Sequence, residues 1–161
     1  MAKLTVLGVG NILMRDEGIG VRVLERVQRA RSWPADVEFI DGGAAGLGLL
    51  SIVEEARRLV VFDAADMHLP PGESRRIGPD QVRSDPAGRM SLHDVPLLEI
   101  IRLCEQFSRR PEVITILAIQ PKAVDYGREL SDELAAAMNR IVAAGVELVE
   151  AELKRIGIDL K

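Results

Sequence analysis

The sequence alternates between short apolar segments and amphipathic segments that have the spacing of a helix. Residues 3–9 (KLTVLGV) form a short, mainly apolar run that is rich in strand-forming residues, and after Gly18 apolar side chains recur every three or four residues. Further predicted strands are 37–40, 59–64 and 113–119, and further predicted helices run through 49–53, 94–108 and 131–156. Continuous apolar strands separated by helices are typical of a parallel sheet that is covered on both faces.

This alternation predicts an α/β fold, a three-layer α/β/α sandwich around a mainly parallel, twisted sheet of about five strands. Two stretches depart from it. Residues 72–78 lack a preceding helix and follow Pro70-Pro71, which predicts a short edge strand of opposite direction. Residues 79–91 carry two prolines, a glycine and few large apolar groups, which predicts an exposed loop. The length of 161 residues fits a single domain, residues 1–161.

Charge and cysteine content exclude several classes of protein. The chain has 21 basic and 25 acidic side chains, a net charge of −4, without a block of like charges, so we expect no nucleic acid partner. The first apolar run ends at Val9 without a cleavage signal, so we expect no signal peptide and no membrane insertion.

The single cysteine, Cys104, forms no disulfide within the chain and fits a cytoplasmic location. It shares a helical face with Leu97 and Ile101, which predicts a buried, inert thiol.

Acidic residues follow three of the predicted strands. Asp16 and Glu17 lie in the loop after the first strand, Asp41 begins the loop after the second, and Asp63 lies at the end of the third. In open parallel sheets, ligands bind outside the carboxyl ends of the strands, where these loops converge. We therefore predict the functional site at this edge.

A histidine lies in a loop that precedes a predicted helix. Pro96 is tolerated in the first turn of a helix, which favours Asp94 as its N-cap, although Ser91 and Asp94 also fit a capping box. With either cap, His93 lies at a helix N-terminus, from where its side chain can reach the same edge.

Carboxylates and one imidazole suit a borderline divalent cation, so Glu17, Asp63 and His93 are the candidate metal ligands. Each residue also has a simpler interpretation. Glu17, like Asp16, could stabilise the positive end of the following helix. Asp63 could form a turn at the end of its strand. A lone histidine in a loop is often a solvated surface residue.

The segment GVGNILMRDEGIGVRV (8–23) is similar to the opening signature of the hydrogenase maturation endopeptidases, a glycine-x-glycine-asparagine turn followed by an acidic pair before the first helix. Further similarities follow in the same order along nearly the whole chain. They are DGGAAG (41–46), VVFDAAD (60–66), Ser91-Leu92-His93 and IQPKAVDYGRELS (119–131).

The resemblance implies an endopeptidase that removes the C-terminal extension from the precursor of a [NiFe] hydrogenase large subunit. It implies that Glu17, Asp63 and His93 form the catalytic site and bind nickel that the precursor already carries. The attacking group stays open, because a metal-bound water and a carboxylate-activated water both fit an acidic site. We expect a monomer.

Three further residues, Asp16, Asp66 and His68, match no clear role in that family. They are candidates for supporting the ligands from outside the metal site.

Two other functions are compatible with parts of the sequence. The pair Gly8 and Gly10 resembles the start of a dinucleotide-binding fingerprint, but Leu13 occupies the position of its third glycine. The absence of a conventional nucleophile motif would also fit a non-catalytic module that holds the nickel-loaded precursor during assembly.

Overall fold

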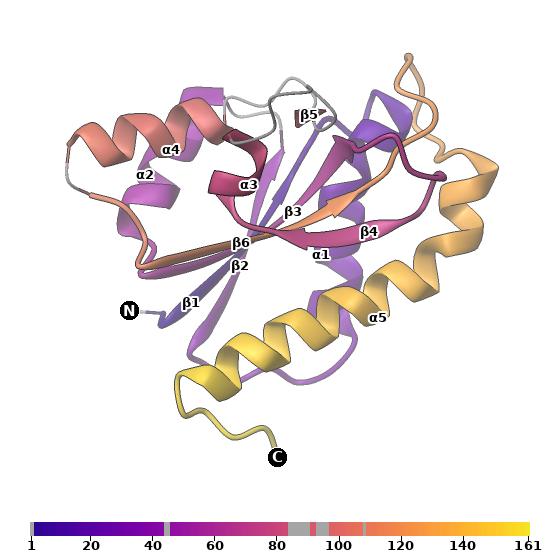
Figure 1. Ribbon diagram of the computed structural model, residues 1–161. Helices are drawn as coiled ribbons and strands as arrows, with labels where there is room; N and C mark the ends of the chain where they lie inside the picture. Colours follow the sequence, from indigo (N-terminus) through magenta and orange to yellow (C-terminus); the bar gives the residue numbers. More distant parts are fainter. Residues whose placement is uncertain (1, 44–45, 84–90, 93–96, 108) are drawn as a thin grey trace.

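A computed structural model describes residues 2–43, 46–83, 91–92, 97–107 and 109–161 of the chain. It shows a sheet with helices on both faces (Figure 1). The strands are β1 (Leu4–Val9), β2 (Val37–Gly43), β3 (Arg58–Asp66), β4 (Ser74–Ile77), β5 (Ser91–Leu92) and β6 (Val113–Ile119). The helices are η1 (Arg15–Gly18), α1 (Ile19–Arg29), η2 (Gly46–Gly48), α2 (Leu49–Glu55), α3 (Pro79–Arg83), α4 (Leu97–Gln106) and α5 (Asp132–Arg155), of which η1 and η2 are 3-10 turns.

The sheet has the strand order β2-β1-β3-β6-β4, and β5 pairs with the end of β3. Strands β2, β1, β3 and β6 are parallel, whereas β4 lies antiparallel to β6 at the edge. The mainly parallel sheet is therefore confirmed, and so is the short edge strand of opposite direction. The parallel pairing sets the carboxyl ends of β1, β2 and β3 at one edge.

Alternating side chains of each strand pack against different helix layers. In β3, Val60 and Phe62 belong to the core beneath α1 and α5, whereas Leu59 and Val61 belong to the core beneath α2 and α4. Figure 1 shows these two pairs of helices on opposite sides of the sheet. The three-layer sandwich is therefore confirmed.

Helix α1 begins close against the sheet because Gly20 has no side chain. A Cβ atom at Gly20 would lie 2.2 Å from the carbonyl oxygen of Phe62 and 2.4 Å from that of Val9. Gly10 has a φ of +130°, and a Cβ there would lie 1.9 Å from the carbonyl oxygen of Glu17. Gly10 resembles part of a dinucleotide-binding fingerprint, but the close packing of the β1–α1 loop is enough to explain why a glycine occupies this position.

Helix α5 begins where the sequence predicts. Ser131 is its N-cap, and the Ser131 hydroxyl accepts a hydrogen bond from the backbone N–H of Leu134 at 3.4 Å. None of the helices in the described part of the chain combines the length and apolar character needed to cross a bilayer.

Three local predictions differ from the structure. Asp41–Gly43 continue β2, whereas the sequence predicted that a loop begins at Asp41, and the register between β1 and β2 shifts there. Residues 79–83 form helix α3, because Pro79 occupies a first turn in which a missing N–H has no cost. Ser91–Leu92 form β5, so the prediction of a loop over 79–91 is also wrong at Ser91. Residues 84–90, and the predicted cap at Asp94 with Pro96, lie outside the described residues.

Candidate active site

Asp63 is a buried carboxylate near the carboxyl end of β3. Its exposed fraction is 1%, and its Oδ2 atom has no hydrogen-bond partner among the residues that the structure describes. Burial raises the pKa of Asp63 well above its usual value, and the negative charge of Glu17 raises it further, against a hydrogen bond from the backbone of Ala64. A buried polar oxygen without a partner is costly and uncommon in folded proteins. The oxygen is therefore suited to binding a cation or a proton.

Glu17 lies in η1, directly after the loop that leaves β1. It is half-buried, and it is close enough to Asp63 for its charge to raise the pKa of that carboxyl group. The parallel pairing of β1 with β3 produces this proximity, because Gly8 lies opposite Phe62 near the ends of the two strands. The structure thus brings two of the three predicted site residues together.

The third predicted residue, His93, lies outside the described residues. Leu92 precedes it in the sequence and pairs with Ala65, two positions after Asp63 on β3. Within the described ranges, histidine, cysteine, aspartate and glutamate side chains form no group of three or more that could hold a metal ion. The complete ligand set of Glu17, Asp63 and His93 therefore stays a prediction.

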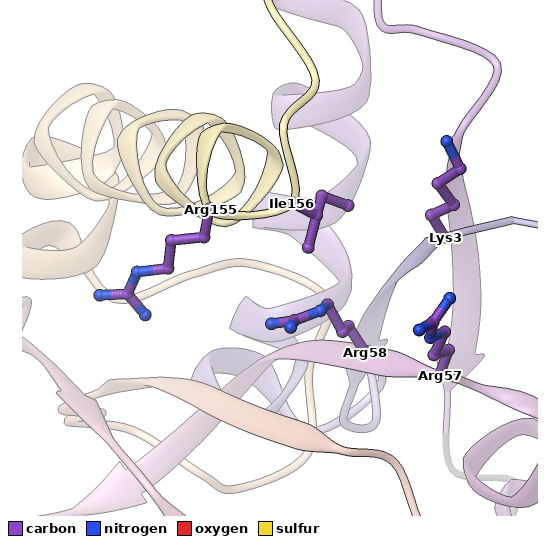
Figure 2. Close-up of a pocket in the computed structure, with 5 residues that line it drawn as sticks. All are labelled: Lys3, Arg57, Arg58, Arg155 and Ile156. Carbon is purple, nitrogen blue, oxygen red and sulfur yellow. The ribbon is translucent and has the colours of Figure 1, made fainter.

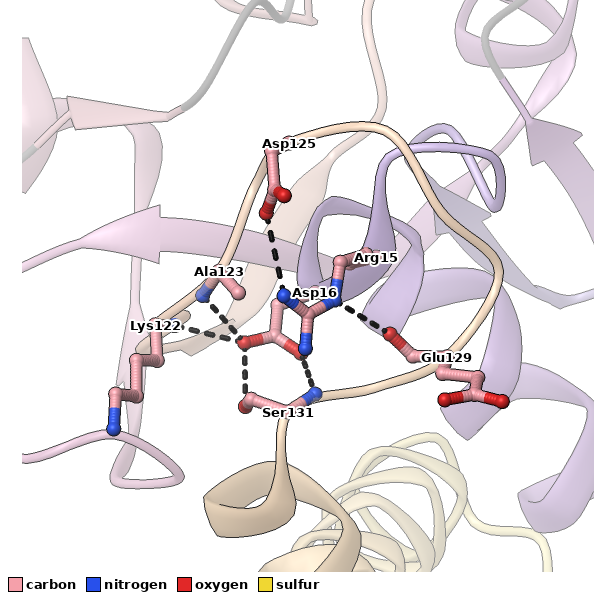
Figure 3. A network of polar contacts seen from close by, with 7 residues as sticks. All are labelled: Arg15, Asp16, Lys122, Ala123, Asp125, Glu129 and Ser131. Carbon is pink, nitrogen blue, oxygen red and sulfur yellow. Dashed lines mark hydrogen bonds and ion pairs between the residues drawn. The ribbon is translucent and has the colours of Figure 1, made fainter.

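Asp16 has a structural role that the sequence did not reveal. Its side chain is fully buried and accepts hydrogen bonds from the backbone N–H groups of Lys122, Ala123 and Ser131 at 2.8–2.9 Å. The Ser131 hydroxyl donates a fourth at 2.7 Å (Figure 3). Burial by itself raises the pKa of Asp16, but these hydrogen bonds outweigh it and hold the pKa below its usual value. Asp16 is therefore an ionised anchor beside Glu17.

The backbone of η1 is also tied to the loop between β6 and α5, which we call the 121–131 loop. The Asp16 N–H donates to the carbonyl of Ala123 at 2.8 Å, and the Arg15 N–H donates to that of Gly127 at 2.9 Å. Figure 3 shows the Arg15 side chain reaching the same loop, where it pairs with Asp125 at 3.3 Å. Segment η1, which carries Glu17, is consequently held by a loop from the distant end of the chain.

Asp66 and Gln120 organise the turn after β3. The Asp66 carboxylate accepts hydrogen bonds from the His68 N–H at 3.1 Å and from the Gln120 side chain at 3.2 Å. Gln120 is buried, and its side-chain oxygen accepts from the N–H groups of Met67 and Leu69. The His68 side chain is exposed, with its Nδ1 3.8 Å from Asp66. Asp66 and Gln120 thus fix the turn that follows the strand carrying Asp63.

An apolar groove of about 260 Å³ adjoins the loop that leads to Glu17. Two of its lining side chains, Ile12 and Leu13, are among the exposed large hydrophobic residues. Asp41 lies at the groove, and its carboxylate accepts a hydrogen bond from the Gly43 N–H at 2.8 Å. The lining residues are Gly10, Asn11, Ile12, Leu13, Val21, Asp41 and Gly43. The groove has the chemistry to accept an extended, partly apolar segment of peptide.

Cys104 is buried in the core between the sheet, α2 and α4, as its helical spacing predicted. Burial raises the pKa of its thiol, and the carboxylates of Glu54 and Glu105 raise it further. A buried thiol that resists ionisation is a poor nucleophile.

Comparison with known proteins agrees with this architecture. A profile of the family described as "Hydrogenase maturation protease" matches residues 21–148. The hydrogenase expression/formation protein HupD of Rhodobacter capsulatus is 36% identical over 160 residues, which cover 98% of this chain and 74% of HupD. The hydrogenase 2 maturation protease of Escherichia coli K12 is 28% identical over 158 residues, which cover 98% of this chain and 94% of that protein.

Solved structures extend the likeness to the fold. The hydrogenase maturating endopeptidase HybD from Escherichia coli superposes with a TM-score of 0.79 at 28% identity, over 98% of this chain and 94% of HybD. An endopeptidase is a peptide hydrolase, so the name of HybD describes that activity. Since the family profile spans most of the chain and the HupD likeness extends over nearly all of it, this chain belongs to the hydrogenase maturation protease family.

Proposed function

We propose that this protein is an endopeptidase that cleaves the C-terminal extension from the nickel-loaded precursor of a [NiFe] hydrogenase large subunit. The observation that carries the proposal is the buried Oδ2 of Asp63, which has no partner in the described part of the chain and lies beside the charge of Glu17. Two carboxyl groups in one poorly solvated place repel each other when both are ionised, and a divalent cation relieves this repulsion. The family membership supports the hydrolase activity.

In this proposal, nickel belongs to the substrate and is not a resident cofactor of the protease. Glu17, Asp63 and His93 supply two carboxylates and an imidazole, which are suitable ligands for a borderline metal ion. Recognition of the metal would restrict cleavage to precursors that are already loaded. A water molecule that attacks the scissile carbonyl is activated either by the metal or by a carboxylate, and both routes fit these residues.

The apolar groove beside Gly10 supports a position for the peptide chain of the precursor. A segment in this groove would lie next to the loop that leads to Glu17, so its backbone would pass close to the bound metal. Holding the peptide bond and the metal site in one arrangement makes hydrolysis effectively intramolecular. The single buried cysteine fits a reducing compartment, and we propose that the reaction takes place in the cytoplasm.

The test is cleavage of purified precursor in its nickel-loaded and nickel-free forms. Mass spectrometry should show that wild type shortens only the loaded form. Glu17→Gln and Asp63→Asn should each lower the rate by about a hundredfold or more. Glu25→Gln is the matched control, because Glu25 is an exposed acid on α1, and it should cleave like wild type.

Equal processing by wild type and Glu17→Gln would refute the role of Glu17. Processing of nickel-free precursor at the same rate would refute metal recognition. Tight binding of loaded precursor by wild type without any cleavage would instead favour a non-catalytic assembly module.

A further inference from the structure

A hollow lined by cations lies at the end of the sheet opposite to Asp63. It has a volume of about 360 Å³ and is lined by Lys3, Arg57, Arg58, Arg155 and Ile156. Figure 2 shows that these side chains come from the starts of β1 and β3 and from the end of α5. Arg58 begins β3, and at about 3.3 Å per residue the strand separates it from Asp63 by roughly 17 Å. The hollow is therefore distinct from the candidate active site.

Arg58 has the least satisfied charge in this hollow. Its side chain is only 23% exposed, yet its guanidinium makes no hydrogen bond with any other described residue. The carboxylate oxygens that face it belong to Glu112 at 3.9 Å and Glu152 at 4.0 Å, which is too far for a hydrogen bond. A guanidinium has five N–H donors, which buried arginines normally direct at carboxylates or carbonyls. The donors of Arg58 are thus available to a ligand in the hollow.

The other three cations each have a carboxylate partner at hydrogen-bond distance. The pairs are Lys3–Asp36 at 3.1 Å, Arg57–Glu112 at 3.0 Å and Arg155–Glu152 at 2.8 Å. Four cations therefore meet three carboxylates, and the charge of Arg58 is in excess. This local excess stands out because the whole chain has a net charge of −4.

The dipole of helix α5 does not account for all the cations around the hollow. Cations near a helix C-terminus offset its dipole, and Lys154 and Arg155 fill that role in the last turn of α5. Lys3, Arg57 and Arg58 belong to the strand side of the hollow and are not part of the helix. Their convergence has a simple explanation if an anion binds between them.

We propose that this hollow binds a small multivalent oxyanion of the phosphoryl or carboxylate type. Planar guanidinium groups bind pairs of such oxygens, and the lysine adds a mobile point charge. Ile156 forms an apolar wall on the side of α5. The proposal does not depend on the protease activity.

Isothermal titration calorimetry of the full chain tests the proposal, with inorganic pyrophosphate and citrate as probes at constant ionic strength. We expect saturable one-to-one binding of at least one probe, and the preferred probe distinguishes a phosphoryl from a carboxylate ligand. Arg58→Gln should weaken binding at least about tenfold. Arg102→Gln is the matched control, because it removes the same charge from an exposed pair with Glu99 on α4 and should bind like wild type.

Arg57→Gln is the second variant, since Arg57 is 66% exposed and its loss should not disturb folding. It should also weaken binding if the hollow is the site. Absence of saturable binding to wild type would overturn the proposal, and so would wild-type affinity in both Arg57→Gln and Arg58→Gln. Arg58→Gln should process the precursor at the wild-type rate, so the outcome for this site is independent of that for the protease.

Discussion

The carboxylate of Asp16 is the common acceptor of four hydrogen bonds, and Asp16→Ala removes it. The donors are the backbone N–H groups of Lys122, Ala123 and Ser131 and the hydroxyl of Ser131. A hydrogen bond to a charged group contributes about 1.5–3 kcal/mol. Adding the contributions of the four hydrogen bonds would overestimate the loss of stability, because they share one carboxylate whose burial itself costs several kcal/mol. We therefore expect Asp16→Ala to lower the free energy of unfolding by about 3–5 kcal/mol.

The contribution of Asp16 to the free energy of unfolding should also depend on pH. Its hydrogen bonds hold the pKa below the ordinary value of 3.8 in spite of burial. Because the pKa is depressed in the folded state, the stabilisation is fully present above the ordinary value and is lost as the pH falls through the folded one. The difference in unfolding free energy between wild type and Asp16→Ala should consequently shrink between about pH 5 and pH 2.

Urea unfolding followed by far-UV circular dichroism at pH 7 measures this difference. Asp125→Ala is the control, because Asp125 is an acid of the same 121–131 loop that is 73% exposed and, among the described residues, pairs with Arg15 alone at 3.3 Å. An exposed pair of this kind contributes about 0–1 kcal/mol. If Asp16→Ala costs no more than Asp125→Ala, the anchoring role of Asp16 is wrong.

Three further predictions concern burial. Asp63→Asn should raise the free energy of unfolding at pH 7 by about 1 kcal/mol or more while lowering the processing rate about a hundredfold or more, because it removes a carboxyl group whose ionised form is disfavoured by burial. A loss of stability in thermal melts would contradict this. Gly20→Ala should cost about 1–3 kcal/mol, since its Cβ would meet two carbonyl oxygens, whereas Gly78→Ala, which meets no atom within 4 Å, should cost far less in the same melts. Cys104 should react with a thiol reagent only in urea, and rapid labelling of the native protein would show that the thiol is accessible.

The longer elements were predictable because their periodicity is local. The apolar run 113–119 coincides with β6, and a serine N-cap correctly marked the start of α5. Strand β5 has only two residues, too few for a period of two to be recognised, and its pairing with β3 depends on a contact with a distant segment. Helix α3 has only five residues and begins at Pro79, and because proline is common both in loops and in the first turn of a helix, its presence does not distinguish the two.

The site was predictable to the extent that strand order determines it. Glu17 follows β1 and Asp63 lies near the carboxyl end of the neighbouring parallel strand β3, so their proximity follows from the topology. The anchoring by Asp16 was not predictable, because its donors lie 106 to 115 residues away in the sequence. The sequence signal was only that two adjacent acids precede one helix, which does not reveal which of them is buried.

The sharing of Asp16 between two loops has a consequence for motion in the native state. The amide hydrogens of Lys122, Ala123 and Ser131 are all donated to one carboxylate, so none of them can be released without disturbing the others. The β1–α1 loop and the 121–131 loop should therefore open as one cooperative unit, and these three amides should exchange with solvent deuterium at a common rate. A movement of the loop before helix α5 would in this way be transmitted directly to Glu17.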